Sequence, residues 1–386
     1  MKEAEAAPGP RPTVVVAGFG PVGAAAAAAL AVSLPATYKI VVLDAVSKPP
    51  LASLDQRMIA VSYGSRVLLE RLGAWNGSDA SPIRRIHVSQ RKVFGRTLLK
   101  ASDYGIDALG YVVPYASLTS ILTGRVSALP VEVRQNARID RCETAGSRID
   151  MSLSDGSVLS ADYVIHAEGQ QDDTVPKRKR DYGQSALSAI VKASHPVADT
   201  AYERFTEEGP LALLPAKDGY ALVWCAKPAE TARRMMLSDA EILAELYNTF
   251  GERLGRFDRI GPRASIPLGL AVALSARGPR EFSIGNAAQS LHPVAGQGFN
   301  LGLRDAFNAS EAIATHFTDP ELANRAFLKS RALDRKATIG MTDLLSRVFA
   351  TPLWPLSAVR GNALAILDLI PALRHPLARQ MMNGQR

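Results

Sequence analysis

Hydrophobic positions near the start of the chain form two short β-branched runs on either side of an alanine-rich segment. Thr13–Ala17 and Tyr38–Leu43 have the pattern of buried parallel strands, and Gly23–Leu34 has high helical propensity. A strand, a glycine-rich turn, a helix and a second strand in this order predict a βαβ unit. Residues 1–12 are polar and proline-rich and lack the apolar stretch of a signal peptide, so we interpret them as the disordered lead of a cytoplasmic protein.

Later hydrophobic runs predict further strands and three helical regions. A second sheet is expected between Tyr182 and about Pro262, and the basic run Lys177–Arg180 is expected to be a solvated loop. Strands are predicted at Val131–Arg134, Arg148–Leu153, Tyr163–His166, Ser185–Ala193 and Tyr220–Ala226. Helices are predicted at Asp239–Phe250, from Gly298 to about Phe317, and over much of Ala337–Met382.

Composition indicates a globular chain of about two domains. Its 386 residues are 47% hydrophobic and 21% charged, which excludes a disordered chain. Two cysteines, Cys142 and Cys225, provide neither a disulfide framework nor a cysteine metal site, and they favour a reducing compartment. The six histidines show no metal-ligand spacing, so we expect no metal.

The net charge of +8 favours an anionic partner such as a membrane surface, although a basic surface without a special partner explains it equally well. The basic residues are scattered and no reading helix is evident, so no nucleic-acid partner is expected. The longest uncharged run, about Val14–Tyr38, is interrupted by glycines and prolines and is not a spanning helix.

A glycine motif lies between the first strand and the first helix. Gly18, Gly20 and Gly23 fit G-x-G-x-x-G, and Asp44 ends the next strand 21 residues after Gly23. In this context the glycines permit a tight turn, a close approach of a pyrophosphate and close packing of the helix on the strand. The helix N-terminus favours phosphate, and Asp44 is placed to accept a hydrogen bond from a ribose hydroxyl. The motif does not distinguish FAD from NAD.

A second glycine-rich helix start occurs in Ile284–Asp305. A strand-like entry is followed by a small-residue turn, His292-Pro293, and then Gly296-Gln297-Gly298 before a helix. Two such helix starts far apart in the sequence indicate one extended ligand that is contacted at both ends, and FAD is long enough for this.

With these motifs the sequence resembles the group A flavoprotein aromatic hydroxylases, most closely the FAD-dependent hydroxylases of ubiquinone biosynthesis. The resemblance extends over most of the chain. Asn286 stands where the family usually has aspartate, as in the branch that converts 2-polyprenyl-6-methoxyphenol to the 1,4-benzoquinol. Shorter shared motifs are Asp55-Gln56-Arg57, Gly110-Tyr111-Val112-Val113, Glu203-Arg204-Phe205-Thr206 and Gly209-Pro210-Leu211-Ala212-Leu213-Leu214-Pro215.

The resemblance implies an α/β fold of the para-hydroxybenzoate-hydroxylase type. It combines a Rossmann-like FAD-binding domain, an interleaved β-sheet substrate domain and a helical C-terminal tail. The FAD-binding domain is expected in residues 13–75, 100–181 and 263–336. The substrate domain is expected in 76–99 and 182–262, and the C-terminal segment in 337–386.

The resemblance also implies FAD as cofactor and NAD(P)H as the expected electron donor. Residues implied for the ADP half are Gly18, Gly20, Gly23 and Asp44, with Arg57 at the pyrophosphate. Gly285 and Asn286 are implied near the ribityl chain and pyrophosphate. The residues implied along the isoalloxazine are Pro293, Ala295, Gly296, Gln297, Gly298 and Asn300, of which Pro293, Gly296, Gln297 and Gly298, together with His292, form the predicted catalytic set.

The implied reaction is hydroxylation of the aromatic ring of a polyprenyl phenol with O₂ through a C4a-hydroperoxyflavin. The cofactor supplies the oxygen chemistry, and the Gly296–Gly298 amides are suited to stabilise negative charge on the reduced ring. His292 is a candidate for phenol deprotonation or a brace of the turn. Arg204 and Tyr220 are candidates for substrate binding or structural pairing. Apolar walls around the ring are expected from the second sheet, at Phe205, Leu213, Leu214 and Trp224, each of which has core packing as its alternative.

The middle motif D-G-x-x-S-x-x-R of these hydroxylases is altered here. The segment begins Ala167-Glu168-Gly169-Gln170, so glutamate replaces aspartate, and the serine and arginine are absent. This alteration is the signature of one alternative, a non-catalytic member of a ubiquinone-biosynthesis hydroxylase complex. The alternative within the enzyme class is a flavin hydroxylase of another aromatic substrate.

The C-terminal segment is rich in apolar residues interspersed with arginine. It predicts peripheral association with the inner membrane, and packing on the core or on a partner subunit is the alternative. A homo-oligomer and other ubiquinone-biosynthesis proteins are further candidate partners.

Overall fold

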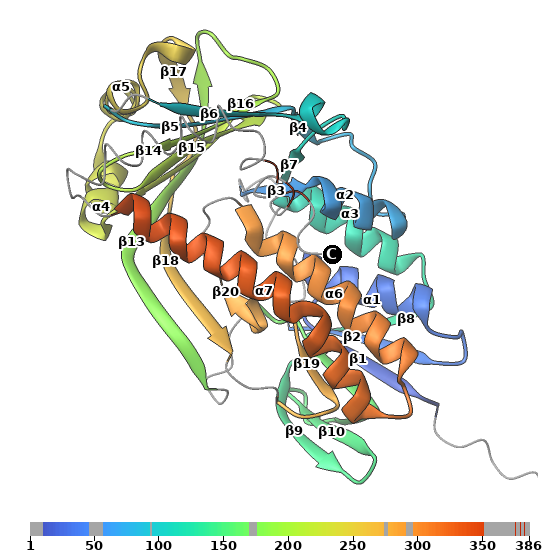
Figure 1. The fold of residues 1–386 in the computed structure, drawn as a ribbon. Helices are drawn as coiled ribbons and strands as arrows, with labels where there is room; N and C mark the ends of the chain where they lie inside the picture. Colours follow the sequence, from blue (N-terminus) through green and yellow to red (C-terminus); the bar gives the residue numbers. More distant parts are fainter. Residues whose placement is uncertain are drawn as a thin grey trace, which may run out of the picture.

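The computed structural model describes residues 11–45, 57–92, 95–169, 176–273, 277–290 and 296–350, together with His375, Arg379 and Met382. Figure 1 shows two sheet systems with long helices beside them.

A five-stranded parallel sheet holds the first glycine motif. Its order is β19-β12-β1-β2-β8, and every neighbouring pair is parallel. The residues of β1 are buried on both faces, because helices cover one face and a small antiparallel sheet covers the other. The predicted strands here are confirmed as β1 (Thr13–Ala17), β2 (Lys39–Asp44), β8 (Val131–Gln135), β12 (Tyr163–His166) and β19 (Glu281–Ser283).

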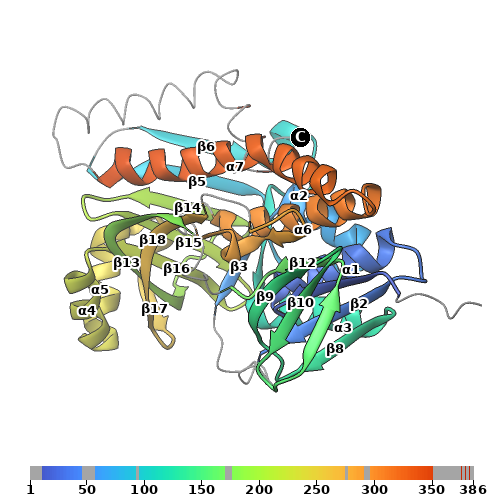
Figure 2. The same cartoon turned by 90° about the horizontal axis from the view of Figure 1, so that it is seen from below.

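Three helices pack on one face of this sheet. The alanines of α1 (Pro21–Ser33) are buried, which lets α1 lie close to both α3 (Tyr115–Ser127) and α6 (Gln297–Thr315). The opposite face carries the sheet β11-β10-β9, visible beneath β12 in Figure 2. Its strands are β9 (Ile139–Ala145), β10 (Arg148–Leu153) and β11 (Val158–Ala161).

The second sheet system is nine-stranded. Its path is β20-β18-β13-β16-β15-β14-β5-β6, and β17 pairs with β13. The strands are β5 (Arg85–Gln90), β6 (Arg96–Lys100), β13 (Lys177–Ala193), β14 (Thr200–Phe205), β15 (Pro210–Ala216), β16 (Gly219–Ala226), β17 (Phe257–Ile260), β18 (Ala264–Ala273) and β20 (Gln289–Ser290).

The two faces of the nine-stranded sheet differ in what covers them. One face packs on α5 (Asp239–Phe250), next to α4 (Pro228–Met236), and we call it the outer face (Figure 1). The other, inner face contacts the sheet β3-β7-β4. Within that small sheet β3 (Met58–Ser62) leads into α2 (Tyr63–Arg71), and its other strands are β7 (Gly110–Pro114) and β4 (Ser81–Ile83). Short 3-10 turns are η1 (Ala101–Tyr104), η2 (Glu252–Leu254) and η3 (Gly285–Ala287).

The basic run Lys177–Arg180 is the first part of β13, so the prediction of a loop is wrong. It pairs residue by residue with β18, from Lys177 opposite Ala273 to Arg180 opposite Leu270. This pairing satisfies the backbone while Arg178 and Lys179 stay exposed, so a solvated charge run and a strand coexist. The sheet therefore extends beyond the predicted boundary at Tyr182, and it also includes β18, which the sequence analysis places in the FAD-binding domain.

The last described helix, α7 (Pro320–Ala350), is continuous across the predicted start of the tail at Ala337. It runs beside α6 (Figure 1). None of the helices in the described residues combines the length and apolar character needed to cross a membrane.

Candidate active site

The first glycine turn is shaped by contacts between backbones. Gly18 has φ +99°, and a Cβ there would lie 2.6 Å from the Ala167 carbonyl oxygen. A Cβ on Gly23 would lie 2.0 Å from the Gly18 carbonyl oxygen, so only glycine lets α1 begin this close to β1. In contrast, a Cβ on Gly20 would meet only the Tyr115 hydroxyl, at 3.8 Å. Gly20 therefore has space beside it, as the approach of a pyrophosphate requires.

Arg57 and Gly20 meet at Tyr115, a residue that the sequence analysis missed. The Arg57 guanidinium lies 3.9 Å from the centroid of the Tyr115 ring, whose hydroxyl is also the nearest neighbour of Gly20. The α1 N-terminus beside them has no side-chain cap, so the amides that follow Pro21 in its first turn remain for a ligand. A cation, free helix amides and an open glycine fit the diphosphate of FAD. Asp44 ends β2 at the same edge of the sheet as the turn.

The second glycine motif packs on the first turn of α1. A Cβ on Gly285 would lie 3.1 Å from Val22, and one on Gly302 would lie 2.9 Å from it. Asn286 in η3 is exposed and thus accessible to a ligand. The two motifs that we expected to contact opposite ends of one ligand are therefore neighbours in space.

The turn before α6 is tied to β3. Gly296 adopts a left-handed conformation (φ +59°), and its Cα faces Ala60. Asn300 donates to the carbonyl oxygens of Ala60 at 2.9 Å and Gly296 at 2.8 Å, and its Oδ1 accepts from the Ser62 amide at 2.8 Å. Because these bonds occupy its amide, we interpret Asn300 as a residue that positions the turn. A Cβ on Gly298 would have no atom within 4 Å, so this side of the helix start is open.

The contacts described above do not include four of the predicted site residues. His292, Pro293 and Ala295 lie outside the described residues. Gln297 is buried at the first position of α6. The roles of all these residues toward FAD remain predictions.

A buried ion pair supports the second motif from α7. Asp305 is fully buried, and its Oδ2 accepts from Gln289 at 2.7 Å and from Arg331 at 3.0 Å. Burial raises the pKa of Asp305, while Arg331 opposes that rise. Sequence patterns indicated no role for Arg331, because α7 was not expected to begin before Ala337.

In the altered middle motif, the carboxylate of Glu168 forms a hydrogen bond with the His166 imidazole. The two ring nitrogens of His166 lie 3.1 Å from Glu168 Oε1 and 2.9 Å from Glu281 Oε2. Although burial opposes protonation, hydrogen bonds to Cys142 and these carboxylates raise the pKa of His166 well above 6.5. Ligand atoms of Cys142, His166 and Glu281 lie within 4.8 Å of one another, but the imidazole already bonds both carboxylates, so we describe an ion-pair cluster.

Because side chains alternate along a strand, the residues predicted to form apolar walls lie on two different faces of the sheet. Leu213 and Trp224 belong to the core beneath the outer face, so they do not line the inner face. Leu214 contributes to the inner-face cluster with Met58 of β3, and Phe205 shares the parity of that face on β14. Tyr220 is also an outer-face core residue, and its hydroxyl bonds the Val197 backbone at 2.9 Å.

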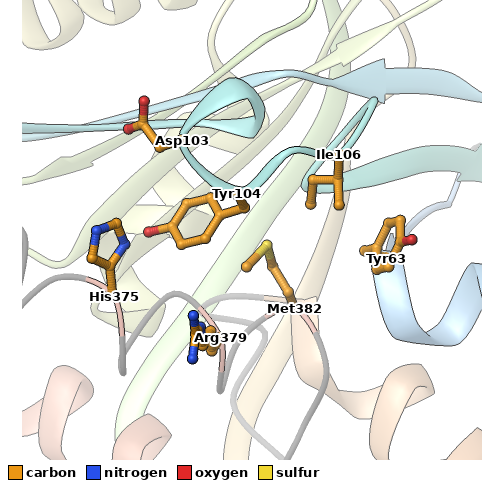
Figure 3. A pocket seen from close by; sticks show the side chains of 7 residues that line it. All are labelled: Tyr63, Asp103, Tyr104, Ile106, His375, Arg379 and Met382. Carbon is orange, nitrogen blue, oxygen red and sulfur yellow. The ribbon is translucent and has the colours of Figure 1, made fainter.

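Residues near the C-terminus border a cavity of about 510 Å³ beside the start of α2 (Figure 3). His375 stacks edge-on against Tyr104 at 5.2 Å between centroids, and Met382 is buried against Leu99 and Leu109. The other lining residues are Tyr63, Asp103, Ile106 and Arg379.

The fold and the paired glycine motifs define an FAD-dependent aromatic monooxygenase of the para-hydroxybenzoate-hydroxylase type. The family model described as "FAD binding domain" matches residues 11–338, and the chain belongs to this family. Both the cofactor and the fold class predicted from the sequence are thus confirmed.

Named relatives agree with the resemblance. The chain is 29% identical over 389 residues to the ubiquinone hydroxylase UbiL of Rhodospirillum rubrum, covering 96% of this chain and 89% of that protein. It is 29% identical over 305 residues to the 3-demethoxyubiquinol 3-hydroxylase of Escherichia coli K12, covering 76% of this chain and 77% of that protein. The structure of p-nitrophenol 4-monooxygenase PnpA from Pseudomonas putida DLL-E4 is similar in fold, with a TM-score of 0.77 at 17% identity, covering 97% and 100% of the two chains.

Proposed function

We propose that this protein is an FAD-dependent hydroxylase of ubiquinone biosynthesis that hydroxylates the ring of a polyprenyl phenol, as in the step from 2-polyprenyl-6-methoxyphenol to the 1,4-benzoquinol. The observation that carries the proposal is the packing of Gly285 and Gly302 on Val22, which brings both flavin motifs together. The names of UbiL and the Escherichia coli enzyme support the pathway. NAD(P)H is the proposed electron donor.

In this proposal each part of the chain has a defined task. Arg57 and the α1 amides hold the diphosphate, and the Gly296–Gly298 amides stabilise negative charge on the flavin ring. When bound, FAD supplies oxygen activation, which side chains do not provide. The inner face of the nine-stranded sheet keeps water from the ring, because Leu214, Ala201 and Met58 form an apolar cluster there.

Quinone-intermediate profiling tests the substrate. A strain lacking its own ring hydroxylase is complemented with this chain or with its Gly20→Val variant. We expect the wild type to consume the polyprenyl phenol intermediate and restore quinone, and the variant to accumulate that intermediate. Restoration by the variant, or accumulation with both chains, would contradict the proposal. Purified yellow protein that hydroxylates only a soluble aromatic would instead support the related flavin hydroxylase.

We also propose peripheral association with the inner membrane through the C-terminal segment, since a polyprenyl substrate resides in lipid. The basic and apolar character of that segment supports this.

A further inference from the structure

Glu203 is an acidic residue on the inner face of the nine-stranded sheet. Its neighbour on β14, Tyr202, packs in the outer-face core with ring contacts to Phe250 and Tyr220. Because side chains alternate along a strand, Glu203 points to the opposite face. Ala201, which has the same parity, packs with Val112 of β7, and this confirms which face it is.

The surroundings of Glu203 are apolar. Directly opposite it lie Ala212 on β15 and Val88 on β5. Within the described part of the chain, no hydrogen-bond donor or cation contacts its carboxylate. The nearest titratable group on this face is the Cys225 thiol on β16, one strand beyond β15, and its pKa is raised by burial and by the charge of Glu203. The residue is half-buried, and desolvation is the cause that raises the pKa of Glu203 to about 7.

Two apolar clusters on the inner face lie beside Glu203, and each extends towards the predicted flavin ring. Ala60, which packs against Gly296, lies on β3 two residues from Met58, and Met58 joins the cluster of Ala201 and Leu214. On the other side, Cys225 packs with Leu268 of β18, the strand that pairs with β20 just before the second glycine turn. Glu203 therefore lies on the part of the inner face between the β3 contact and the β18 contact.

We propose that Glu203 is a catalytic residue that accepts the proton of the substrate's phenolic hydroxyl. The inference rests on the proposed function. The phenolic O–H bond breaks, the proton moves to a Glu203 carboxylate oxygen, and the electron pair stays on the phenol oxygen. The resulting phenolate is more electron-rich at the ring carbons ortho and para to it, where the monooxygenase reaction adds oxygen. A base with a pKa near the working pH suits this transfer.

Other ionisable residues of the sheet are less suited to this task. Arg204 has the parity of the outer face and lies near Gly251. The Tyr220 hydroxyl is already bonded to the backbone of Val197. His87 contacts Tyr202 on the outer face, and burial with nearby arginines lowers its pKa to about 4.

The test compares Glu203→Gln with wild type and with Glu207→Gln, a matched control at an exposed glutamate in the following turn. The probes are a short-chain 2-prenyl-6-methoxyphenol and its ring-fluorinated analogue, which ionises more readily. The first measurement is the ultraviolet spectrum of each bound phenol across pH, which reports phenol and phenolate without turnover. The second is the rate of product formation, with FAD content and thermal unfolding as checks on folding.

We expect Glu203→Gln to retain FAD and to bind the probe un-ionised. We expect its hydroxylation rate to fall about 10²- to 10³-fold, with much smaller loss for the fluorinated probe. The wild-type rate should decrease below about pH 7, and this decrease should be absent in the variant. If Glu203→Gln keeps the wild-type rate and pH profile, or if its rate falls equally with both probes, Glu203 is not the base. The proposed function would still stand in that case. If wild type neither binds nor hydroxylates either phenol, the proposed function fails as well. Glu203→Asp, which keeps the carboxylate, should recover part of the rate, and this separates chemistry from misfolding.

Discussion

Asn300 on α6 donates a hydrogen bond from Nδ2 to the carbonyl oxygen of Ala60 on β3, over 2.9 Å and across 240 positions of sequence. The same amide bonds Gly296 and the Ser62 backbone. The turn that begins α6 is therefore held at a fixed distance from β3, and through β3 from the inner face of the nine-stranded sheet.

Replacing Asn300 should loosen this connection. Asn300→Ala leaves a buried amide and two carbonyl oxygens without their partner, so we expect the free energy of unfolding to fall by about 2–4 kcal/mol. The hydroxylation rate should fall more than the loss of folded protein explains, because the turn at Gly296 loses its support. Thermal unfolding and product formation measure the two effects. Asn308→Ala, on the same helix and without a side-chain hydrogen bond in the described structure, is the control. Equal behaviour of the two variants would show that the connection is dispensable.

The first glycine turn permits a paired test. Gly20 has an extended backbone (φ −70°) and open space, so Gly20→Val should fold and yet lose FAD, since its side chain enters the pyrophosphate position. Gly23→Ala instead meets the Gly18 carbonyl oxygen at 2.0 Å and should destabilise the fold itself. Flavin absorbance and thermal unfolding distinguish these effects. Folded Gly20→Val with full flavin would show that this turn does not bind the cofactor.

Gly298→Ala tests the second turn. No atom lies within 4 Å of the added methyl, and alanine favours helix by up to about 1 kcal/mol, so the apoprotein should be no less stable. Hydroxylation should nevertheless decrease much more than FAD content, because the methyl meets the ring edge. An equal loss of both would mean that this turn contributes to general cofactor affinity.

Local patterns in the sequence predicted most of this core. The strands of the five-stranded sheet and both glycine motifs follow from short windows, because burial on both faces and glycine geometry leave clear local signals. The strand at Lys177–Arg180 does not follow from such a window, because its pairing with β18 is a tertiary interaction that overrides a local charge pattern.

The site was predictable only in part for the same reason. Tyr115 has no local signature that marks it as the residue between Arg57 and Gly20. Glu203 was visible within a family motif, but its isolation depends on which strands flank β14. The cluster of His166, Glu168 and Glu281 joins residues 115 positions apart, beyond any local window.

The stability contributed by His166 should depend on pH in a defined direction. Its folded-state pKa lies above 6.5, so the imidazolium stabilises the fold fully below that pH, and the contribution is lost as pH rises through the folded-state pKa. His166→Asn should therefore lower the free energy of unfolding by roughly 3 kcal/mol near pH 6, and by progressively less in alkaline solution. Denaturant unfolding across pH measures this. His87→Asn is the control with the opposite trend, because the lowered pKa of His87 makes its contribution disappear as pH falls. A cost at His166 that is constant with pH would contradict a charged imidazole.

The C-terminal segment has features that favour membrane binding and others that favour packing on the protein. Leu344 to Arg379 is dense in leucine, isoleucine, phenylalanine and tryptophan with interspersed arginine, which favours an anionic lipid surface. Met382 and His375, however, contact Leu99 and Tyr104, which shows that part of the segment docks on the protein beside the cavity of Figure 3. In the sequence, Arg347, Arg360 and Arg374 are interspersed in the apolar stretch before these residues, and they are the groups that we expect a membrane to attract.

We therefore predict that vesicle binding depends on those arginines. At about 1 kcal/mol per basic residue near an anionic surface, replacing Arg347, Arg360 and Arg374 with glutamine should weaken binding by several kcal/mol. Flotation with anionic and neutral vesicles at low and high salt measures this in the full-length protein. High salt should weaken wild-type binding without abolishing it, because apolar insertion is not screened. A triple replacement of the half-buried Arg134 and the exposed Arg138 and Arg141 removes the same charge from the other sheet system and should leave flotation unchanged. If the wild type stays unbound to anionic vesicles at low salt, the segment serves only to pack on the protein, and the substrate must reach the site by another surface.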